Sequence, residues 1–245
     1  MQIDKEEKDI SVVILCYKAG EEVSIFIDDM KRQLTLRGLS YELVLVANYN
    51  AHEKDTDKTP SIVKRIALSD PSITVVSRAK EGMMGWDLRS GLDVASGKTI
   101  AIIDGDGQMP AEDIVRVYDA LVSGAYDCAK TYRVKRGDGL TRGIISLIYN
   151  TLLTLLFPKV RVKDANAKPK IFSKQAFKKL RLTSPSWFVD AEIIIQGTYL
   201  NFHFIEIPTD FRENKYRKSF VKPGAIFEFL GNLILFRLTR MHEFK

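Results

Sequence analysis

Short apolar runs alternate with amphipathic helical patterns through the first half of the chain. The apolar runs predict buried strands at 10–17, 42–47, 73–77, 99–104 and about 126–131. The helical patterns predict helices between them, at 21–36, 60–68, 86–95 and about 111–123. This alternation is typical of an α/β fold with a mostly parallel, doubly wound sheet, in which ligands bind beyond the carboxyl ends of the strands. We therefore expect Tyr17, Asn48 and Asp104, which fall at such ends, to share a site.

The most specific motif follows the fourth of these strands. It reads Asp104-Gly105-Asp106-Gly107-Gln108 and places two carboxylates one residue apart. Carboxylate and amide oxygens are ligands that Mg²⁺ and Mn²⁺ prefer, usually with substrate phosphates completing the shell. The motif predicts a divalent cation site for a phosphate-bearing substrate. An acidic turn that caps the next helix is the simpler alternative, because Pro110, Glu112 and Asp113 are typical of a helix start.

The composition is that of a soluble globular protein. The 245 residues, 45% hydrophobic and 28% charged, suit one large domain or one domain with a tail. Cys16 and Cys128 lie in apolar, strand-like runs, which favours buried free thiols in a reducing compartment. Residues 1–9 lack the apolar core of a secretory signal, and no apolar run is long enough to span a bilayer. We expect a cytoplasmic protein.

Charge is distributed unevenly along the chain. Residues 1–129 hold 15 Lys and Arg against 22 Asp and Glu, whereas residues 130–245 hold 22 against 9. The basic residues gather at 161–181 and at 212–222. This asymmetry favours an anionic partner for the second half, which leaves nucleic acid, anionic lipid and phosphorylated substrate open. A solvated basic surface without a partner is the alternative.

Two nearly uncharged helices are predicted in the second half. Residues 143–157 carry no charge, and residues 224–236 carry only Glu228 and are followed by Arg237 and Arg240. Fifteen residues at about 1.5 Å each cover only about 22 Å, which is short of a bilayer. An apolar helix with flanking cations is typical of a membrane interface, but packing on the domain or on a partner chain is equally consistent. We expect one domain at 1–222 and a C-terminal amphipathic helix at 223–245.

These motifs resemble those of the family 2 glycosyltransferases, within them the branch of dolichol-phosphate mannosyltransferase and bactoprenol glucosyltransferase. The resemblance runs from Val12 to about Ser219. Its most specific element is Asp104-Gly105-Asp106-Gly107-Gln108-Met109-Pro110, which matches the Asp-x-Asp-x-Gln-x-Pro metal motif of the polyprenyl-phosphate branch. The fold that it implies is GT-A, a Rossmann-like, mostly parallel sheet flanked by helices.

The resemblance also implies a role for each matched position. The nucleoside-diphosphate sugar would be bound by Tyr17, Lys18, Glu22, Asn48, Gly82, Gly85, Arg89, Asp104 and Asp106. The Mg²⁺ or Mn²⁺ ion would be held by Asp104, Asp106 and Gln108. The catalytic residues would be Arg133, which resembles the arginine that meets the sugar diphosphate, and Asp164 and Asp190. The acceptor would be bound by Lys168, Lys170, Arg212, Lys215, Arg217 and Lys218.

The chain departs from the family pattern at two motifs. Asn48 stands where paired aspartates normally follow the second strand, and Lys168-Pro169-Lys170 replaces Gly-Phe-Arg. We also expect no C-terminal transmembrane hairpin of the kind seen in some relatives. Two of the aspartates have structural alternatives. Asp190 is predicted to be a helix N-cap, and Asp164 to orient the adjacent basic loop.

The implied reaction is an inverting displacement at the anomeric carbon of the sugar, with a nucleoside diphosphate leaving. The expected acceptor is a polyprenyl phosphate at the inner face of the cell membrane, to which the protein binds peripherally. Such an acceptor is already ionised and scarcely needs a general base. The alternative is a soluble transferase acting on a hydroxyl acceptor of a cell-surface polysaccharide, with Asp164 or Asp190 as base. A nucleic-acid binder is disfavoured because no recognised motif is present. The oligomeric state is left open.

Overall fold

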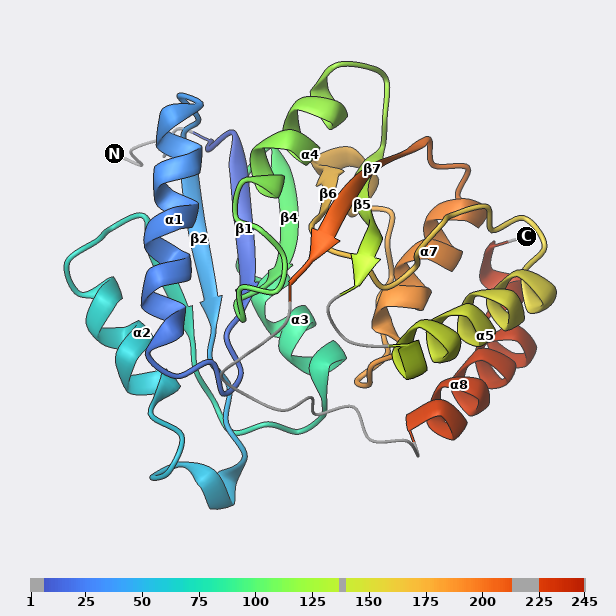
Figure 1. The fold of residues 1–245 in the computed structure, drawn as a ribbon, viewed down its shortest axis with the longest axis horizontal. Helices are drawn as coiled ribbons and strands as arrows, with labels where there is room; N and C mark the ends of the chain where they lie inside the picture. The colour runs from blue at the N-terminus through green and yellow to red at the C-terminus, as the bar shows by residue number, and fades with distance from the viewer. Residues whose placement is uncertain (1–6, 137–139, 213–224, 245) are drawn as a thin grey trace.

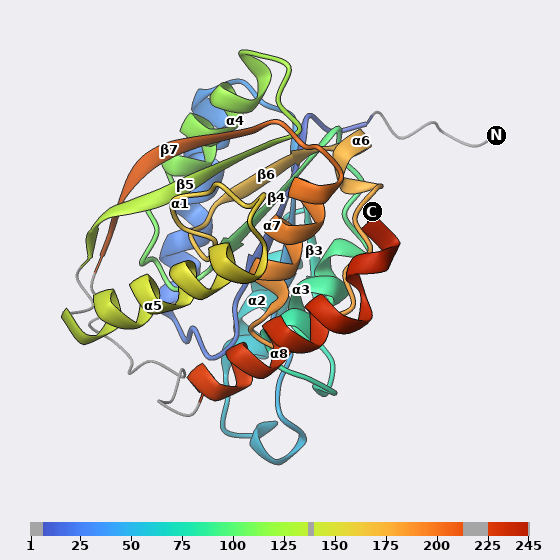
Figure 2. The same cartoon turned by 90° about the vertical axis from the view of Figure 1, so that its right-hand side faces the viewer.

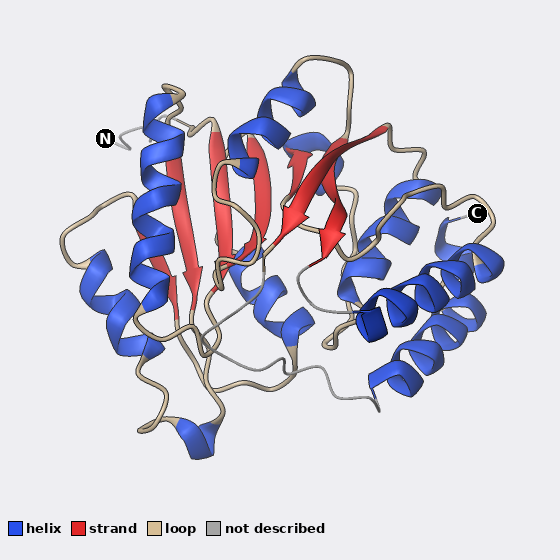
Figure 3. Ribbon diagram, in the orientation of Figure 1, coloured by secondary structure: helices blue, strands red, loops and turns tan. Residues whose placement is uncertain are grey.

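A computed structural model describes residues 7–136, 140–212 and 225–244 of the protein. In these residues seven strands form one sheet, in the order β3-β2-β1-β4-β6-β5-β7. Figure 1 shows the strands side by side across the picture with helices around them, and Figure 3 separates the strands from the helices by colour. The α/β, mostly parallel sheet expected from the sequence is confirmed.

The first half forms the parallel part of the sheet, in which β2 and β4 flank β1 and β3 lies beyond β2. Its elements are β1 (Ile10–Leu15), α1 (Glu22–Leu36), β2 (Tyr41–Val46), α2 (Thr59–Ala67), β3 (Ile73–Val76), α3 (Met84–Leu92), β4 (Thr99–Asp104) and α4 (Asp113–Val122). Each lies within a few residues of its predicted range. A short 3₁₀ turn at Ala51–Glu53 follows β2.

The second half adds the strands that the alternation did not predict in full. Its elements are β5 (Cys128–Arg136), α5 (Leu140–Leu156), β6 (Lys170–Ser173), α6 (Lys174–Phe177), α7 (Val189–Tyr199), β7 (Phe204–Phe211) and α8 (Ala225–Thr239), followed by a 3₁₀ turn at Met241–Phe244. Strand β6 runs antiparallel to both β4 and β5, whereas β7 runs parallel to β5 at the sheet edge. Because β6 is reversed, its amino end reaches the carboxyl end of β4, where Ile102 faces Lys170.

Two apolar layers cover the sheet, as alternate residues of β1 illustrate. Val12 and Ile14 pack with α1, α2 and α4 on one face, whereas Val13 and Leu15 pack with α3, α7, α5 and α8 on the other. Figure 2 shows α3, α7 and α8 on the side of the sheet away from α1 and α4. Both cysteines are buried free thiols, as predicted. Strands buried on both faces need continuous apolar runs, which is why the sequence shows them.

The helices α5 and α8 pack side by side on the domain (Figure 1). The rings of Tyr149 and Phe229 are 5.1 Å apart, and those of Phe157 and Phe236 are 6.3 Å apart. Their outer sides expose a set of large apolar side chains, here called the two-helix face: Leu147, Ile148, Leu155, Ile234, Leu235 and Leu238. In the described part of the chain no helix is long and apolar enough to cross a membrane. The predicted division at residue 222 lies outside the described residues.

Candidate active site

The carboxyl ends of β1, β2 and β4 meet at one edge of the sheet. Leu15, which ends β1, is the register partner of both Val46 on β2 and Asp104 on β4. Tyr17 and Asn48 follow these strands by two residues. The edge therefore gathers the three polar positions that the sequence placed at strand ends. The reversed strand β6 brings its own amino end to the same edge.

The loop after β1 is tied to the loop after β2. Lys18 Nζ donates to a Glu53 carboxylate oxygen at 2.6 Å, and Asn50 Nδ2 donates to Tyr17 Oη at 2.9 Å and to Glu53 at 2.7 Å. The Lys80 ammonium lies 3.9 Å from the centre of the Tyr17 ring. Lys18 has a φ of 51°, a left-handed conformation that is uncommon outside glycine. These contacts hold Tyr17 and Lys18 in place at the edge where the donor is expected.

Asn48 has a structural role that its position at a strand end did not reveal. Its side chain is buried, and Nδ2 donates to Asp87 Oδ1 and to Ser90 Oγ, both at 3.0 Å. Its Oδ1 accepts the Arg78 backbone N–H at 3.0 Å. Asp87 also pairs with Lys80. The amide thus ties α3 to β2, and the donor contact expected for Asn48 stays a prediction.

The glycine-containing entry to α3 packs against the segment 184–186. A Cβ at Gly85 would lie 2.3 Å from the Ser184 carbonyl oxygen, and one at Gly82 would lie 3.1 Å from Pro185 Cβ. Both glycines therefore allow a close backbone approach. The Nε atom of Arg89 is buried without a hydrogen-bond partner among the described residues. Donor contacts stay a prediction for Tyr17, Lys18, Glu22, Gly82, Gly85, Arg89, Asp104 and Asp106.

The metal motif forms a turn that is anchored to the end of β7. The Gln108 backbone N–H donates to Asp106 Oδ1 at 3.1 Å, and Gln108 Nε2 donates to the Arg212 carbonyl at 3.1 Å. The Arg212 backbone N–H donates back to the Gln108 carbonyl at 2.9 Å. Gly107 has a φ of 69°, which favours glycine. The backbone of this turn is therefore fixed before any ligand binds.

The geometry of this turn fits a cation that arrives with substrate phosphates. Helix α4 begins at Asp113 with Glu112 as its N-cap, so Asp104 and Asp106 do not cap it and the acidic-turn alternative is wrong. The Asp104 side chain is 34% exposed. Within the described ranges, no three His, Cys, Asp or Glu side chains gather closely enough to hold a metal alone. Because Mg²⁺ often binds one or two carboxylates plus substrate phosphates, Asp104 and Asp106 suit such an ion, while the role of Gln108 stays a prediction.

A buried ion-pair network lies behind Asp104. Lys168 Nζ is 3.1 Å from Asp104 Oδ2 and 3.1 Å from Asp190 Oδ2, and Lys170 Nζ is 2.6 Å from Asp190 Oδ1. Burial alone would lower the pKa of Lys168, but the two carboxylates raise it above its ordinary value. Burial likewise opposes ionisation of Asp190, but the two lysines hold its pKa below the ordinary value. Lys168 and Asp190 therefore stay charged at neutral pH, whereas burial lowers the pKa of Lys170 to about 8.

This network corrects expectations for Lys168, Lys170 and Asp190. Lys170 is fully buried and Lys168 is 2% exposed, so both ammonium groups face carboxylates of the protein and not an acceptor. Asp190 is not the N-cap of α7, because that position belongs to Phe188 and the Asp190 carboxylate turns toward the lysines. The sequence showed lysines in an acceptor motif, but not the reversed strand that carries them inward.

Arg133 and Asp164 form a second pair at this edge. Arg133 Nε and Nη2 donate to the two Asp164 oxygens at 2.6 and 2.9 Å. Burial would raise the pKa of Asp164, but the Arg133 guanidinium holds it at about 2. Lys130, which sequence reasoning missed, is fully buried and donates to the Asp164 carbonyl at 2.6 Å and to Glu206 at 3.0 Å. Its only signal was a charge inside an apolar strand. The loop-orienting role predicted for Asp164 agrees with these contacts.

The remaining predicted acceptor residues lie toward the end of β7. Arg212 is exposed and pairs with Glu112 at 3.2 Å. Lys215, Arg217 and Lys218 lie outside the described residues.

Known proteins resemble this chain in sequence over much of its length. A dolichol-phosphate mannosyltransferase of Pyrococcus furiosus is 26% identical over 230 residues, which is 91% of this chain and 62% of that protein. Glycosyltransferase AglD of Haloferax volcanii is 28% identical over 160 residues, which is 63% of this chain and 26% of that protein. An undecaprenyl-phosphate 4-deoxy-4-formamido-L-arabinose transferase of Yersinia pestis is 26% identical over 62% of this chain and 45% of that protein. The chain thus spans less than two thirds of the length of these relatives.

Solved structures share the fold. Glucosyl-3-phosphoglycerate synthase of Mycobacterium tuberculosis, in complex with Mn²⁺, uridine diphosphate and glucosyl-3-phosphoglycerate, matches 94% of this chain and 80% of its own with a TM-score of 0.71 and 18% identity. The same enzyme with Mg²⁺ and uridine diphosphate matches with a TM-score of 0.67 and 16% identity. The family model described as glycosyl transferase family 2 matches residues 11–181, well over half of the sequence. The chain therefore belongs to glycosyl transferase family 2.

Proposed function

We propose that the protein transfers a sugar from a nucleoside-diphosphate sugar to a polyprenyl phosphate. The observation that carries this proposal is that both candidate bases, Asp164 and Asp190, are held in ion pairs. Asp164 is clamped by Arg133, and Asp190 lies between two buried lysines. Neither can take a proton from a hydroxyl near neutral pH, whereas a phosphate acceptor is already ionised. The names of two relatives, which specify dolichol phosphate and undecaprenyl phosphate, support the same acceptor class.

The donor would bind at the edge formed by β1, β4 and the metal motif. Asp104 and Asp106 would hold Mg²⁺ or Mn²⁺ with oxygens of the diphosphate, and the ion would stabilise negative charge on the leaving group. Lys168 balances the charge of Asp104 from behind, so the exposed side of this carboxylate faces the ligand. Arg133 lies on β5, which β6 separates from β4, with its guanidinium oriented by Asp164. Attack by the acceptor phosphate opposite the diphosphate would invert the anomeric configuration.

The acceptor chemistry places the proposed reaction at a membrane. A polyprenyl chain is buried in lipid, and the two-helix face offers apolar side chains from both α5 and α8 to such a surface. Leu155 and Leu238 are 68% and 77% exposed. We infer that this face rests on the inner surface of the cell membrane and brings the site to its acceptor.

Sugar transfer tests the proposed reaction. Purified protein is given uridine- and guanosine-diphosphate sugars with Mn²⁺, and either a polyprenyl phosphate or a simple glycoside with free hydroxyls. We expect labelled sugar on the phosphate only, and a loss of about 100-fold or more in Asp106→Ala. Asp93→Ala, which removes an exposed carboxylate at the end of α3, is the control and keeps activity. Preferred transfer to the glycoside, or unchanged transfer in Asp106→Ala, would contradict the proposal.

Flotation with liposomes tests the membrane contact. The double variant Leu155→Gln/Leu238→Gln removes apolar area from the two-helix face and should float less well than the unaltered protein. Leu68→Gln is the matched control, because Leu68 is 88% exposed beside α2. Equal flotation of all three proteins would contradict the proposed membrane contact but not the proposed sugar transfer.

A further inference from the structure

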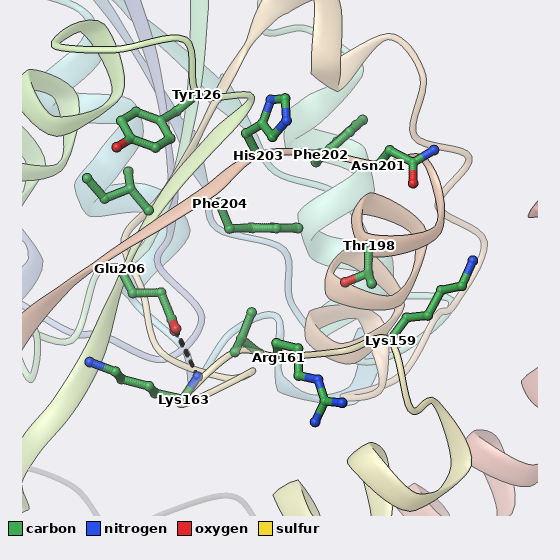
Figure 4. Close-up of a pocket in the computed structure, with 12 residues that line it drawn as sticks. Tyr126, Lys159, Arg161, Lys163, Thr198, Asn201, Phe202, His203, Phe204 and Glu206 are labelled. Atoms are coloured by element: carbon green, nitrogen blue, oxygen red, sulfur yellow. Dashed lines mark hydrogen bonds between the residues drawn. The ribbon is translucent and has the colours of Figure 1, made fainter.

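A cavity of about 710 Å³ lies on the outer side of β7, away from the metal motif. Its walls come from the start of β7, the end of α7 and the segment 159–163 that follows α5. Figure 4 shows Lys159, Arg161 and Lys163 along one side of the cavity, with Tyr126 and His203 on the other. This volume suits a small organic molecule. We call it the basic cavity.

The segment 159–163 presents its charges outward. Val160 is 2% exposed and Val162 packs against the core, whereas Lys159, Arg161 and Lys163 between and beside them are exposed. This alternation of burial places the three cationic side chains on the outer side. The two valines fix the segment to the domain, so the cations are carried on an anchored stretch of chain.

The carboxylate in the wall does not neutralise these cations. Glu206 accepts the backbone N–H of Lys163 at 2.9 Å and the ammonium of the fully buried Lys130 at 3.0 Å. Its charge is therefore balanced from inside the protein. Among the described residues, Lys159, Arg161 and Lys163 form no ion pair. The ammonium groups of Lys159 and Lys163 instead lie 5.2 and 4.0 Å from the ring centres of Tyr199 and Tyr132.

The other side chains that line the cavity indicate which class of ligand it suits. Phe202, Phe204 and Tyr126 offer aromatic surface, and Thr198 and Asn201 offer hydrogen-bonding groups. A planar guanidinium without a carboxylate partner matches phosphate oxygens in a bidentate way. Rings beside it suit a sugar or another weakly polar group. The cavity is far larger than inorganic phosphate alone requires.

We propose that the basic cavity binds the phosphate group of an organic phosphate, with Arg161 as the main contact and Lys159 and Lys163 beside it. The ligand has two possible sources with the same chemistry. Lys159 lies four residues beyond Leu155 of the two-helix face, so a phospholipid headgroup can supply the phosphate. A soluble sugar phosphate can supply it as well. This site is separate from the donor site and does not depend on the proposed transfer.

The test compares Arg161→Gln with Lys64→Gln, which removes an exposed cation from α2 on the opposite side of the sheet. Glucose 6-phosphate is titrated calorimetrically, and vesicles of phosphatidylglycerol are co-sedimented with the full chain. We expect Arg161→Gln to weaken binding of at least one probe by about tenfold, and Lys64→Gln to leave both unchanged. Loss for glucose 6-phosphate alone assigns a soluble ligand, and loss for the vesicles alone assigns a lipid headgroup.

Two results would overturn the proposal. One is equal binding of both probes by Arg161→Gln and Lys64→Gln. The other is loss of binding in Asp106→Ala, because that would place the phosphate at the metal motif. Retained binding in an Asp106→Ala protein that has lost sugar transfer supports a second site. Unchanged thermal unfolding of Arg161→Gln verifies that the exposed substitution has not altered the fold.

Discussion

Two groups of basic side chains that are neighbours in the sequence have opposite surroundings in the fold. Lys168 and Lys170 are buried, and each ammonium group meets an aspartate. Arg161 and Lys163, a few residues earlier, are exposed and form no ion pair with any described residue. The first group holds the protein together, and the second is available to a ligand. A count of charges along the sequence does not separate these two roles. The antiparallel direction of β6 does, because it buries one group and leaves the other exposed.

The two groups also differ in what their removal should cost. A buried charge that loses its partner is strongly destabilising, because it remains in a poorly solvated place. An exposed charge contributes little to folding, since water solvates it in both states. Substitutions in the two groups should therefore give very different losses in the free energy of unfolding, and these losses test the comparison.

The largest effect is expected for Asp190→Asn. It leaves the buried ammonium groups of Lys168 and Lys170 without their shared carboxylate, and we expect a loss of about 3–5 kcal/mol in the free energy of unfolding. Urea unfolding followed by circular dichroism measures it. Asp93→Asn, at an exposed position, should change stability by less than about 0.5 kcal/mol. A similar small loss for both would mean that the network is not structural.

A smaller loss is expected for Lys168→Met. Asp190 keeps Lys170, so we expect a loss of about 1.5–3 kcal/mol in the free energy of unfolding. Asp104 loses its internal cation, and Mn²⁺ should then bind more tightly in the presence of uridine diphosphate, as measured by calorimetry. Equal or weaker Mn²⁺ binding in a folded Lys168→Met protein would show that Lys168 does not compete for the charge of Asp104.

Acid should weaken the fold through Asp164. Its pKa is about 2 in the folded protein, below the ordinary value of about 3.9. The ionised carboxylate therefore stabilises the folded state above about pH 4, and this contribution, about 2.5 kcal/mol, is lost as the pH falls through about 2. Unfolding free energies measured from pH 5 to pH 2 should fall less steeply for Asp164→Asn. Parallel curves for the two proteins would contradict this role.

The smallest effect is expected in the basic cavity. The triple variant Lys159→Gln/Arg161→Gln/Lys163→Gln removes exposed charges that have no carboxylate partner among the described residues. We expect the free energy of unfolding to change by less than about 0.5 kcal/mol per substitution, the range of ordinary surface changes. Thermal unfolding in the absence of phosphate measures this. A loss of several kcal/mol in the free energy of unfolding would contradict the expected difference between the buried and the exposed basic side chains.

Much of the fold could be predicted because its parallel part is encoded locally. The apolar run of β4 and the turn after it were placed within a residue, since a strand buried on both faces leaves a continuous apolar run. Strand β6 was not predicted. It is four residues long, begins with Lys170 and owes its place to β4 and β5 rather than to its own sequence.

For the candidate site, the sequence predicted the metal motif but not the buried contacts behind it. Asp104 and Asp106 follow a strand end, which the sequence states directly. The burial of Lys168, and the use of Asn48 to fix α3, depend on contacts between segments far apart in the chain. For Lys168 and Asn48, the residue type alone suggested contact with a ligand. Only the three-dimensional arrangement shows that their polar atoms already bond to groups of the protein.

The position of β6 has a consequence for how the chain is assembled. Strand β5 is synthesised before β6, yet β6 lies between β5 and β4 in the sheet. A chain released on the ribosome only as far as α5 would present β4 as a bare edge, open to pairing with another chain. Four late residues therefore join the two halves of the molecule. Truncation before Lys168 would remove the join, and with it the cation that pairs with Asp104, from a protein that still contains its whole metal motif.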